Sequence, residues 1–213
     1  DFMNITPDKQ RMDSLMVAAN IRNLSLLELF YTCVSNLCKI MNERGTKIPD
    51  EQHHYIEKDD YNKCIYHKRD MDATERTIVV MKDADILIKI CDSTGDFDDT
   101  SEYQLLIRLL KEHTIIDDDG SRRLRQKEEV ENPSEVLLNP SDPEATFRYK
   151  AGGKHLGYVG NIVESVGENG SLIIDYDYQP NTYADNQFMK DYLKRKKRFF
   201  RWFLFCCRWS IQW

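Results

Sequence analysis

The chain has 213 residues, of which 41% are hydrophobic and 31% are charged, and its mean hydropathy is -0.62. This composition is that of a folded protein large enough for one good-sized domain or two small ones, and it excludes a disordered chain. Residues 190–213 contain eight basic residues and one acidic residue, so the preceding part carries a net charge of -13 within a total of -6. Because DNA affinity depends on neutralising phosphates, we expect this acidic part to be a poor non-specific DNA binder.

The six cysteines form no C-x2-C pair, and the first ten residues, DFMNITPDKQ, contain no apolar signal core. We therefore expect a reducing, cytoplasmic location. The first residue is Asp1 and not Met, from which we infer that the chain begins inside a longer reading frame.

The first half of the chain is expected to be mainly helical. Residues 10–20, QRMDSLMVAAN, fit either a buried strand or the start of a helix. Residues 24–42 place apolar side chains three and four positions apart, and Ser25 and Glu28 form a capping box, which predicts an amphipathic helix. Further helices are predicted at about 50–68, 73–92 and 100–115.

The pattern changes in the second half. Residues 117–145 are polar, contain two Pro-bearing turns and indicate a connection. Two β-rich runs at about 156–179 are joined by Asn169-Gly170, which predicts a hairpin. Asp185 is the expected N-cap of a helix that follows. The predicted order is strand, helical block, hairpin and helix.

Several residues have side chains that could bind a metal or phosphate. His53, His54, Cys64 and His67 are zinc-ligand types, but their spacing matches no standard motif, and neighbouring positions on a helix are the favoured explanation. Residues 151–160, AGGKHLGYVG, lack the order of a phosphate-binding loop, so a flexible turn entering a strand is favoured.

Asp13 is the most informative acidic residue. A carboxylate within a buried apolar strand is costly unless it is paired, hydrogen-bonded or bound to a cation. Considered by itself, Asp13 is more simply explained as the N-cap of a helix that starts at Ser14. The neighbouring sequence favours a different interpretation.

Three stretches resemble transposases of bacterial insertion sequences, in the same order and at the same separations: RMDSLMVAANIRNLSLLELFY, EYQLLIRLLKEHTIIDDDGSRRLR and NPSDPEATFRYKAGGKHLGYVGNIVESVGENGSLIIDYDYQPNTYADNQFMKDYL. The resemblance covers about residues 5–193 and is to the DDE group with a long helical insertion after the first catalytic strand. It implies an α/β fold in which residues 1–193 form a partial RNase H-like catalytic core, a mixed sheet with flanking helices. The helical insertion would span about 23–145, and the hairpin would supply the second and third strands.

The resemblance also implies a chemistry. In this family two Asp residues and one Glu hold two Mg²⁺ ions, which activate a water or a DNA 3′-hydroxyl for in-line attack on a phosphodiester. The first acid lies on the first strand before a small residue, so Asp13, followed by Ser14, is the implied catalytic and metal-binding residue. The second Asp and the Glu are expected after residue 193 but are absent from residues 194–213. We therefore expect this chain to lack the transposition activity of its family.

The implied partner is DNA at the ends of an insertion sequence. Lys150, Lys154 and His155 are candidate contacts to the DNA backbone, although solvated loop charge is the simpler explanation. Asp142 and Asp185 lie in short sequence motifs that recur in the family, but neither residue is assigned a role in metal binding. The alternative function is a non-catalytic DNA-binding or regulatory remnant, and a nuclease that uses Asp13, Asp142 and Asp185 is a weaker one. An interrupted sheet would leave an unpaired edge, which favours self-association.

Residues 194–213, KRKKRFFRWFLFCCRWSIQW, are basic and aromatic, unlike the rest of the chain. They suit a membrane interface or generic nucleic-acid binding, but the apolar run is too short to span a bilayer, and no specific membrane partner is expected. Written with permitted codons and shifted by one base, residues 201–213 encode Asp-Gly-Ser-Tyr-Ser-Val-Ala-Asp-Gly-Ala-Tyr-Ser-Gly. This contains the strand that the family places here, and the single Trp codon forces a Gly at each Trp position. We predict that the tail is out-of-frame translation.

Overall fold

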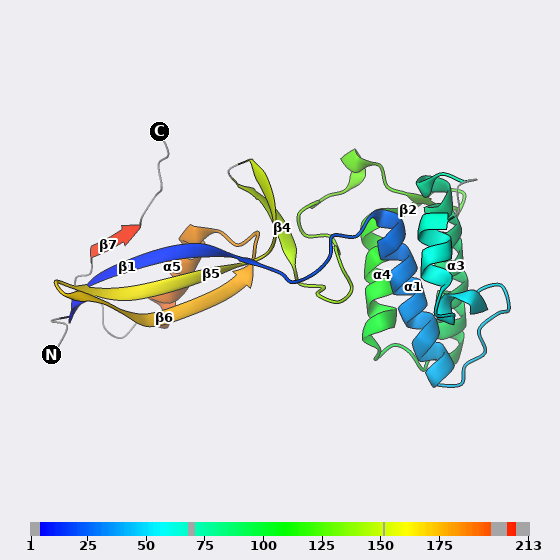
Figure 1. Cartoon of the computed structure of the whole chain (residues 1–213), viewed down its shortest axis with the longest axis horizontal. Helices are drawn as coiled ribbons and strands as arrows, with labels where there is room; N and C mark the ends of the chain where they lie inside the picture. Colours follow the sequence, from blue (N-terminus) through cyan, green and yellow to red (C-terminus); the bar gives the residue numbers. More distant parts are fainter. Residues whose placement is uncertain (1–4, 68–70, 151, 197–203, 208–213) are drawn as a thin grey trace. The chain divides into compact units, whose positions relative to one another are not determined.

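The computed structural model of the chain describes residues 5–67, 71–150, 152–196 and 204–207. It is a mixed α/β structure that divides into two compact units (Figure 1). The sheet unit consists of residues 1–20 and 144–213, and the helical unit consists of Ile21–Pro143. Among the described residues, no helix has both the length and the apolar character needed to cross a membrane.

The sheet unit contains a five-stranded mixed sheet. Its strands are β1 (Ile5–Ala18), β4 (Thr146–Lys150), β5 (Gly153–Gly167), β6 (Gly170–Pro180) and β7 (Leu204–Cys207). The strand β5 pairs antiparallel with β1, β4 and β6, whereas β7 runs parallel to β1 along its other edge (Figure 1). Residues 10–18, for which the sequence left strand and helix open, therefore belong to a strand, and Asp13 is not a helix N-cap.

The hairpin predicted from Asn169-Gly170 is present. The strands β5 and β6 pair from Tyr158 opposite Pro180 to Gly167 opposite Gly170, so Glu168 and Asn169 form the turn. A shift of register between Val163 and Glu164 marks an irregularity within this ladder. Two long strands joined by a tight turn give the sheet its central ladder.

One face of the sheet is covered by helix α5 (Asp185–Arg195). Apolar side chains from the helix and from β1 and β5 form a small core there: Met12, Val159, Val163, Phe188 and Tyr192. The Tyr192 hydroxyl donates to the buried Gln10 Oε1 at 2.9 Å and so joins α5 to β1. The expected N-cap was wrong by one position, because the chain turns at Pro180–Tyr183 and the Ala184 carbonyl accepts the first helical hydrogen bonds.

The helical unit is built around three helices: α1 (Leu26–Glu43), α3 (Ala73–Thr94) and α4 (Ser101–His113). Their buried faces share one apolar core, in which Phe30, Leu37 and Leu106 are fully enclosed. The capping box of Ser25 and Glu28 is present at the start of α1. The helices predicted at 24–42, 73–92 and 100–115 are therefore confirmed.

The single helix predicted at about 50–68 was wrong. The structure has three short pieces instead: η1 (His53–Ile56), α2 (Asp60–Asn62) and η2 (Lys63–His67). Extended backbone at Glu57 interrupts the helix, while the Ser35 hydroxyl of α1 donates to the Tyr55 carbonyl at 2.8 Å. Packing against α1 thus takes precedence over local helix propensity.

The polar connection at 117–145 is also more ordered than expected. Strands β2 (Thr114–Ile116) and β3 (Arg122–Leu124) form a small antiparallel pair, and η3 (Lys127–Glu129) follows. The Arg123 guanidinium contacts Asp117 and Glu129, with Nη1 2.8 Å from Glu129 Oε2. Ion pairing, which the turn-rich sequence does not indicate, orders this segment.

Candidate functional site

Asp13 lies in the middle of β1, opposite Ile162 of β5. Its side chain is exposed, so the cost of burying a carboxylate does not arise. Successive side chains of a strand point to opposite faces, and the neighbouring Met12 is buried against α5. Asp13 therefore lies on the face of the sheet opposite α5, which we call the open face.

Aromatic and apolar side chains surround Asp13 on the open face. Pairing places Tyr176 of β6 in line with Ile162 and Asp13, and Tyr176 is 78% exposed. Leu15 and Tyr178 are exposed on the same face, because each lies two residues further along its strand, opposite Gly160 of β5. The strands β1, β5 and β6 thus present apolar and aromatic side chains to solvent beside the Asp13 carboxylate.

The backbone around Asp13 is fixed from β5. Asn161, which is buried, donates from Nδ2 to the Ser14 Oγ at 2.9 Å and to the Asp13 carbonyl at 3.3 Å. On the open face, Arg11 pairs with Glu164 across the same two strands. Sequence reasoning identified neither contact, because the partners lie on strands that are distant in the sequence.

The strand β7 lies directly beside the Asp13 segment. Lys9 to Met12 pair in parallel with Leu204 to Cys207, so β7 ends opposite Met12, one residue before Asp13. The sequence of β7, Leu-Phe-Cys-Cys, contains no carboxylate. Residues 208–213 lie outside the described residues.

The acidic residues of β6 belong to the other face. Arg195 of α5 contacts Asp177 at 2.8 Å and Asp175 at 3.4 Å. Partial burial disfavours ionisation of Asp177, but hydrogen bonds from Arg195, the Tyr178 N–H and Gln179, with the positive charge of Arg195, together outweigh burial and lower the pKa of Asp177. These carboxylates are ion-paired beneath α5 and do not contribute to a site with Asp13.

Lys150, Lys154 and His155 lie together on the β4–β5 hairpin. The Lys154 Nζ stands 4.2 Å above the Phe147 ring, and His155 Nε2 is 3.2 Å from the Lys150 carbonyl. Tyr149, which pairs with Lys154, is 71% exposed. This basic and aromatic hairpin is separated from Asp13, because Lys154 is eight residues along β5 from Ile162, or about 26 Å.

Asp185 does not assemble with Asp13 in the sheet unit. Asp142 belongs to the helical unit, and Asp185 is exposed at the start of α5, on the other side of the sheet. Within the described part of the chain, the close groups of three His, Cys, Asp or Glu side chains do not include Asp13. The arrangement therefore gives no support to a three-Asp nuclease.

Of the four zinc-ligand types in residues 53–67, the structure brings together His54 and Cys64. Their partner is Asp60, which sequence reasoning did not consider, whereas His53 and His67 are exposed and outside the group. The useful signal was the spacing of four between Asp60 and Cys64, which places both side chains on one side of a helical turn.

No family model, curated protein or solved structure matches the chain. The function is therefore inferred from the residues and from their positions in the two units.

Proposed function

We propose that the chain derives from a DDE transposase of a bacterial insertion sequence and that the sheet unit corresponds to part of an RNase H-like catalytic core. The order of elements supports this proposal. A strand with Asp13 comes first, a helical unit follows it, and the hairpin β5–β6, the helix α5 and the strand β7 complete the sheet unit. This is the order that the sequence resemblance implies.

The observation that carries the proposal is the parallel pairing of β7 with β1. Two metal ions a few ångströms apart need carboxylates that converge from neighbouring segments. A strand that follows α5 and runs beside β1 would bring its own acidic residue next to Asp13. With the permitted codons used above, the shifted reading frame has Tyr-Ser-Val-Ala at the four positions of β7 and an Asp immediately after them.

The residues present do not fit a pair of Mg²⁺ ions. Asp13 supplies one carboxylate, β7 supplies none, and Asp175 and Asp177 are held by Arg195 on the other face. One exposed carboxylate is a weak ligand for a hard cation that prefers an octahedral shell of oxygens. We therefore propose that this chain does not cleave or join DNA.

The nucleotide sequence through codons 190–213 and beyond tests the frameshift directly. We expect the frame shifted by one base to encode Val-Ala-Asp-Gly-Ala-Tyr and, further on, a Glu. A nucleotide sequence without these residues in that frame would refute the proposal.

A frame-restored protein tests the chemistry. We expect it to nick supercoiled DNA that carries the element ends, with a requirement for Mg²⁺, and we expect the present chain to leave this DNA intact. Asp13→Asn should abolish the nicking, whereas Asp185→Asn, a change of an exposed acid on the other side of the sheet, should preserve it. Equal nicking by the restored protein and its Asp13→Asn variant would count against Asp13 as a metal ligand.

A DNA-binding remnant without catalysis is the second candidate, and the β4–β5 hairpin favours it. Lys150 and Lys154 are exposed there beside Tyr149 and Phe147, and basic residues interleaved with aromatic residues suit contact with phosphates and bases. Replacing both lysines by Ala should weaken DNA binding and reduce the slope of log affinity against log salt by about 1.8.

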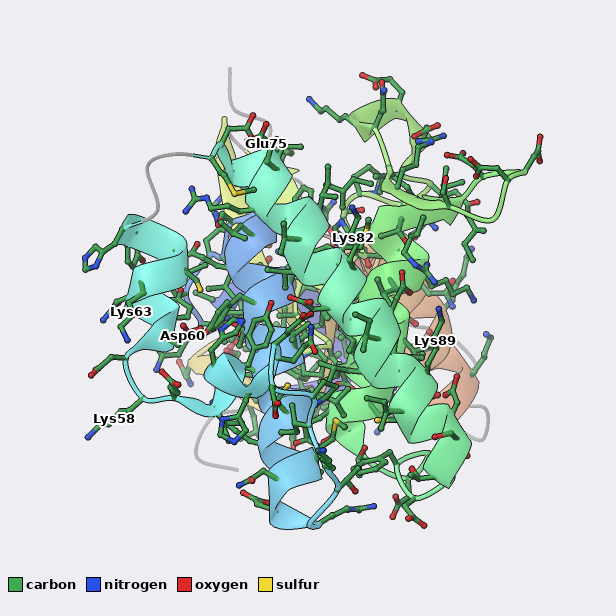
Figure 2. All side chains as sticks on the ribbon, turned by 90° about the vertical axis from the view of Figure 1, so that its right-hand side faces the viewer. Lys58, Asp60, Lys63, Glu75, Lys82 and Lys89 are labelled. Carbon is green, nitrogen blue, oxygen red and sulfur yellow. The ribbon has the colours of Figure 1, made fainter. Side chains whose placement is uncertain are left out.

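The matched control is the double replacement of Lys82 and Lys89, two exposed lysines on α3 of the helical unit (Figure 2). It removes the same charge from a surface that the proposal does not assign to DNA. The same loss of affinity in both double variants would mean that binding reflects overall charge and not the hairpin.

A further inference from the structure

The residues His54, Asp60 and Cys64, which we call the HDC cluster, lie in the three short helical pieces between α1 and α3. His54 comes from η1, Asp60 begins α2, and Cys64 lies one helical turn later, in η2. Figure 2 shows this segment beside α1, with the Lys58 and Lys63 side chains directed away from the helices. Asp60 is buried, although an Asp at a loop-rich surface segment is ordinarily exposed.

The distances within the HDC cluster approach those of a tetrahedral metal site. His54 Nδ1 lies 2.7 Å and Cys64 Sγ lies 3.3 Å from Asp60 Oδ2, and all three ligand atoms are within 4.8 Å of one another. Zinc binds nitrogen and oxygen at about 2.0–2.2 Å and sulfur at about 2.3 Å, so its tetrahedral ligands are about 3.4 Å apart. Shifts of less than about 1 Å would therefore create the site.

Contacts outside the cluster hold two of its residues in position. The hydroxyl of Tyr31, which is 2% exposed on α1, donates to Asp60 Oδ2 at 2.6 Å. Arg76 of α3 donates from Nη1 to the carbonyls of Cys64 and Ile65 at 2.9 and 2.8 Å. Metal ligands are commonly oriented by such hydrogen bonds, and these two join the cluster to both neighbouring helices.

Asp60 is also suited to remain charged. Burial disfavours its ionisation, but hydrogen bonds from Tyr31, His54 and Cys64 outweigh burial and lower the pKa of Asp60. A buried carboxylate surrounded by hydrogen-bond donors is stable without a metal ion. The same arrangement forms in a metal-free site whose ligands hydrogen-bond to one another.

A small cavity supplies room for a fourth ligand. It has a volume of about 60 Å³ and is lined by His54 and Cys64, by the charged residues Arg76 and Asp83, and by apolar residues that include Leu27 and Val80. This volume is enough for a water molecule, which needs about 10–15 Å³ in the same measure. A cavity that borders two of the three ligand residues fits the open position of a three-ligand site.

We propose that His54, Asp60 and Cys64 bind one Zn²⁺ ion, with a water molecule in the cavity as the fourth ligand. Nitrogen, oxygen and thiolate ligands together suit zinc better than magnesium or calcium. On binding, the Cys64 thiol releases its proton to solvent, and His54 binds through Nδ1 with its own proton on Nε2. The thiolate and the carboxylate then balance the two positive charges of the ion.

The consequence of binding is structural and is independent of any DNA chemistry in the sheet unit. Zinc would fasten residues 53–67 to the side of α1, where the helix predicted from the sequence is broken into short pieces. Binding to the folded state alone stabilises it, so zinc should raise the unfolding temperature of the helical unit and a chelator should reverse the effect.

The test uses the full chain, reduced and metal-free, with Cys206 and Cys207 replaced by Ser so that the tail contributes no thiols. Zinc titration should show one ion per chain, and Co²⁺ should give the near-ultraviolet charge-transfer absorption of a cobalt thiolate. Cys64→Ser should abolish this absorption while circular dichroism shows the helices intact. Absence of the thiolate absorption in the parent chain would overturn the proposal, leaving Asp60 as a hydrogen-bonded carboxylate only.

Adjacent residues provide matched controls. His54→Ala and Asp60→Asn should each weaken zinc binding by about 100-fold, and Tyr31→Phe by about tenfold through loss of orientation. His53→Ala and Asp59→Asn change exposed neighbours of the same type and should leave the affinity unchanged. Equal losses in the ligand variants and in these controls would show that zinc binds elsewhere.

Discussion

Gly157 is the residue of the sheet at which a single methyl group should be most damaging. Its φ is +136°, a backbone conformation that L side chains rarely adopt, and it pairs with Ala18 near the end of β1. A Cβ at this position would lie 2.3 Å from the Val17 carbonyl oxygen and 2.5 Å from the Ala19 nitrogen. Real Cβ contacts are essentially never under 3.0 Å, so the backbone of β1 would have to move by about 0.7 Å.

The magnitude follows from these two effects. A side chain forced into such a backbone conformation costs about 1–3 kcal/mol, and moving a paired strand adds to this, so Gly157→Ala should destabilise the β1–β5 ladder by about 3 kcal/mol. An opening equilibrium shifted by that amount changes on the order of 100-fold. The Ala19 N–H, which donates to the Leu156 carbonyl at 3.1 Å, should lose protection with the rest of the ladder.

Hydrogen exchange measured residue by residue is the appropriate assay, because two separate units need not unfold in one transition. Amides of Leu15 to Ala19 should exchange faster in Gly157→Ala, and amides of α1 should not change. Gly153→Ala is the matched control, since a Cβ on Gly153 in the same strand meets nothing closer than 3.5 Å. Similar exchange rates in the two variants would refute the reasoning from backbone clash.

Three further predictions concern single contacts. Tyr192→Phe removes the buried hydrogen bond to Gln10 and should lower the free energy of unfolding of the sheet unit by about 1–2 kcal/mol, measured by urea denaturation; no change would mean that Gln10 finds another donor. Leu106→Ala removes a fully buried side chain and should cost the helical unit about 2–5 kcal/mol in thermal unfolding, and a loss below about 1 kcal/mol would contradict the packing described. Hydrogen bonds from Arg123 and from the Gln126 N–H lower the pKa of Glu129 from 4.5 to about 2, so the stabilisation is present above pH 4.5 and is lost as the pH falls toward 2; in Arg123→Ala the pKa, followed by NMR, should rise part of the way back toward 4.5 and this pH dependence should weaken, and an unchanged pKa would contradict the role of Arg123.

The sequence predicted elements well where the determining contacts are local. Apolar spacing and a capping box specify α1, and Asn169-Gly170 specifies the turn between β5 and β6. The segment 50–68 failed because distant contacts decide its shape: Tyr31 of α1 binds Asp60, and Ser35 of α1 binds the Tyr55 carbonyl. A window of neighbouring residues contains neither partner.

The candidate sites were less predictable than the elements. Asp13 could be singled out as an acid in an apolar run, but its exposure depends on which face of β1 receives α5. The role of Arg195 as the partner of Asp175 and Asp177 could not be read either, because it requires α5 to lie across β6. The sequence indicated His54 and Cys64 of the HDC cluster. It did not indicate Asp60, because most Asp residues are exposed and nothing in the sequence marks this one as buried.

The pairing of β1 with β5 also constrains the order in which the protein can form during synthesis. Asn161 and Asp13, which are hydrogen-bonded across β1 and β5, are 148 residues apart, and Tyr192 and Gln10 are 182 apart. The helical unit, by contrast, is one continuous segment that closes on itself. On a ribosome the first strand therefore emerges early and stays without its partner until the helical unit and the strand β5 have been made. Pairings of such long range are intrinsically slow, and the unpaired strand, which ends in the apolar run Leu15–Ala18, is the part of the nascent chain that a chaperone would be expected to hold.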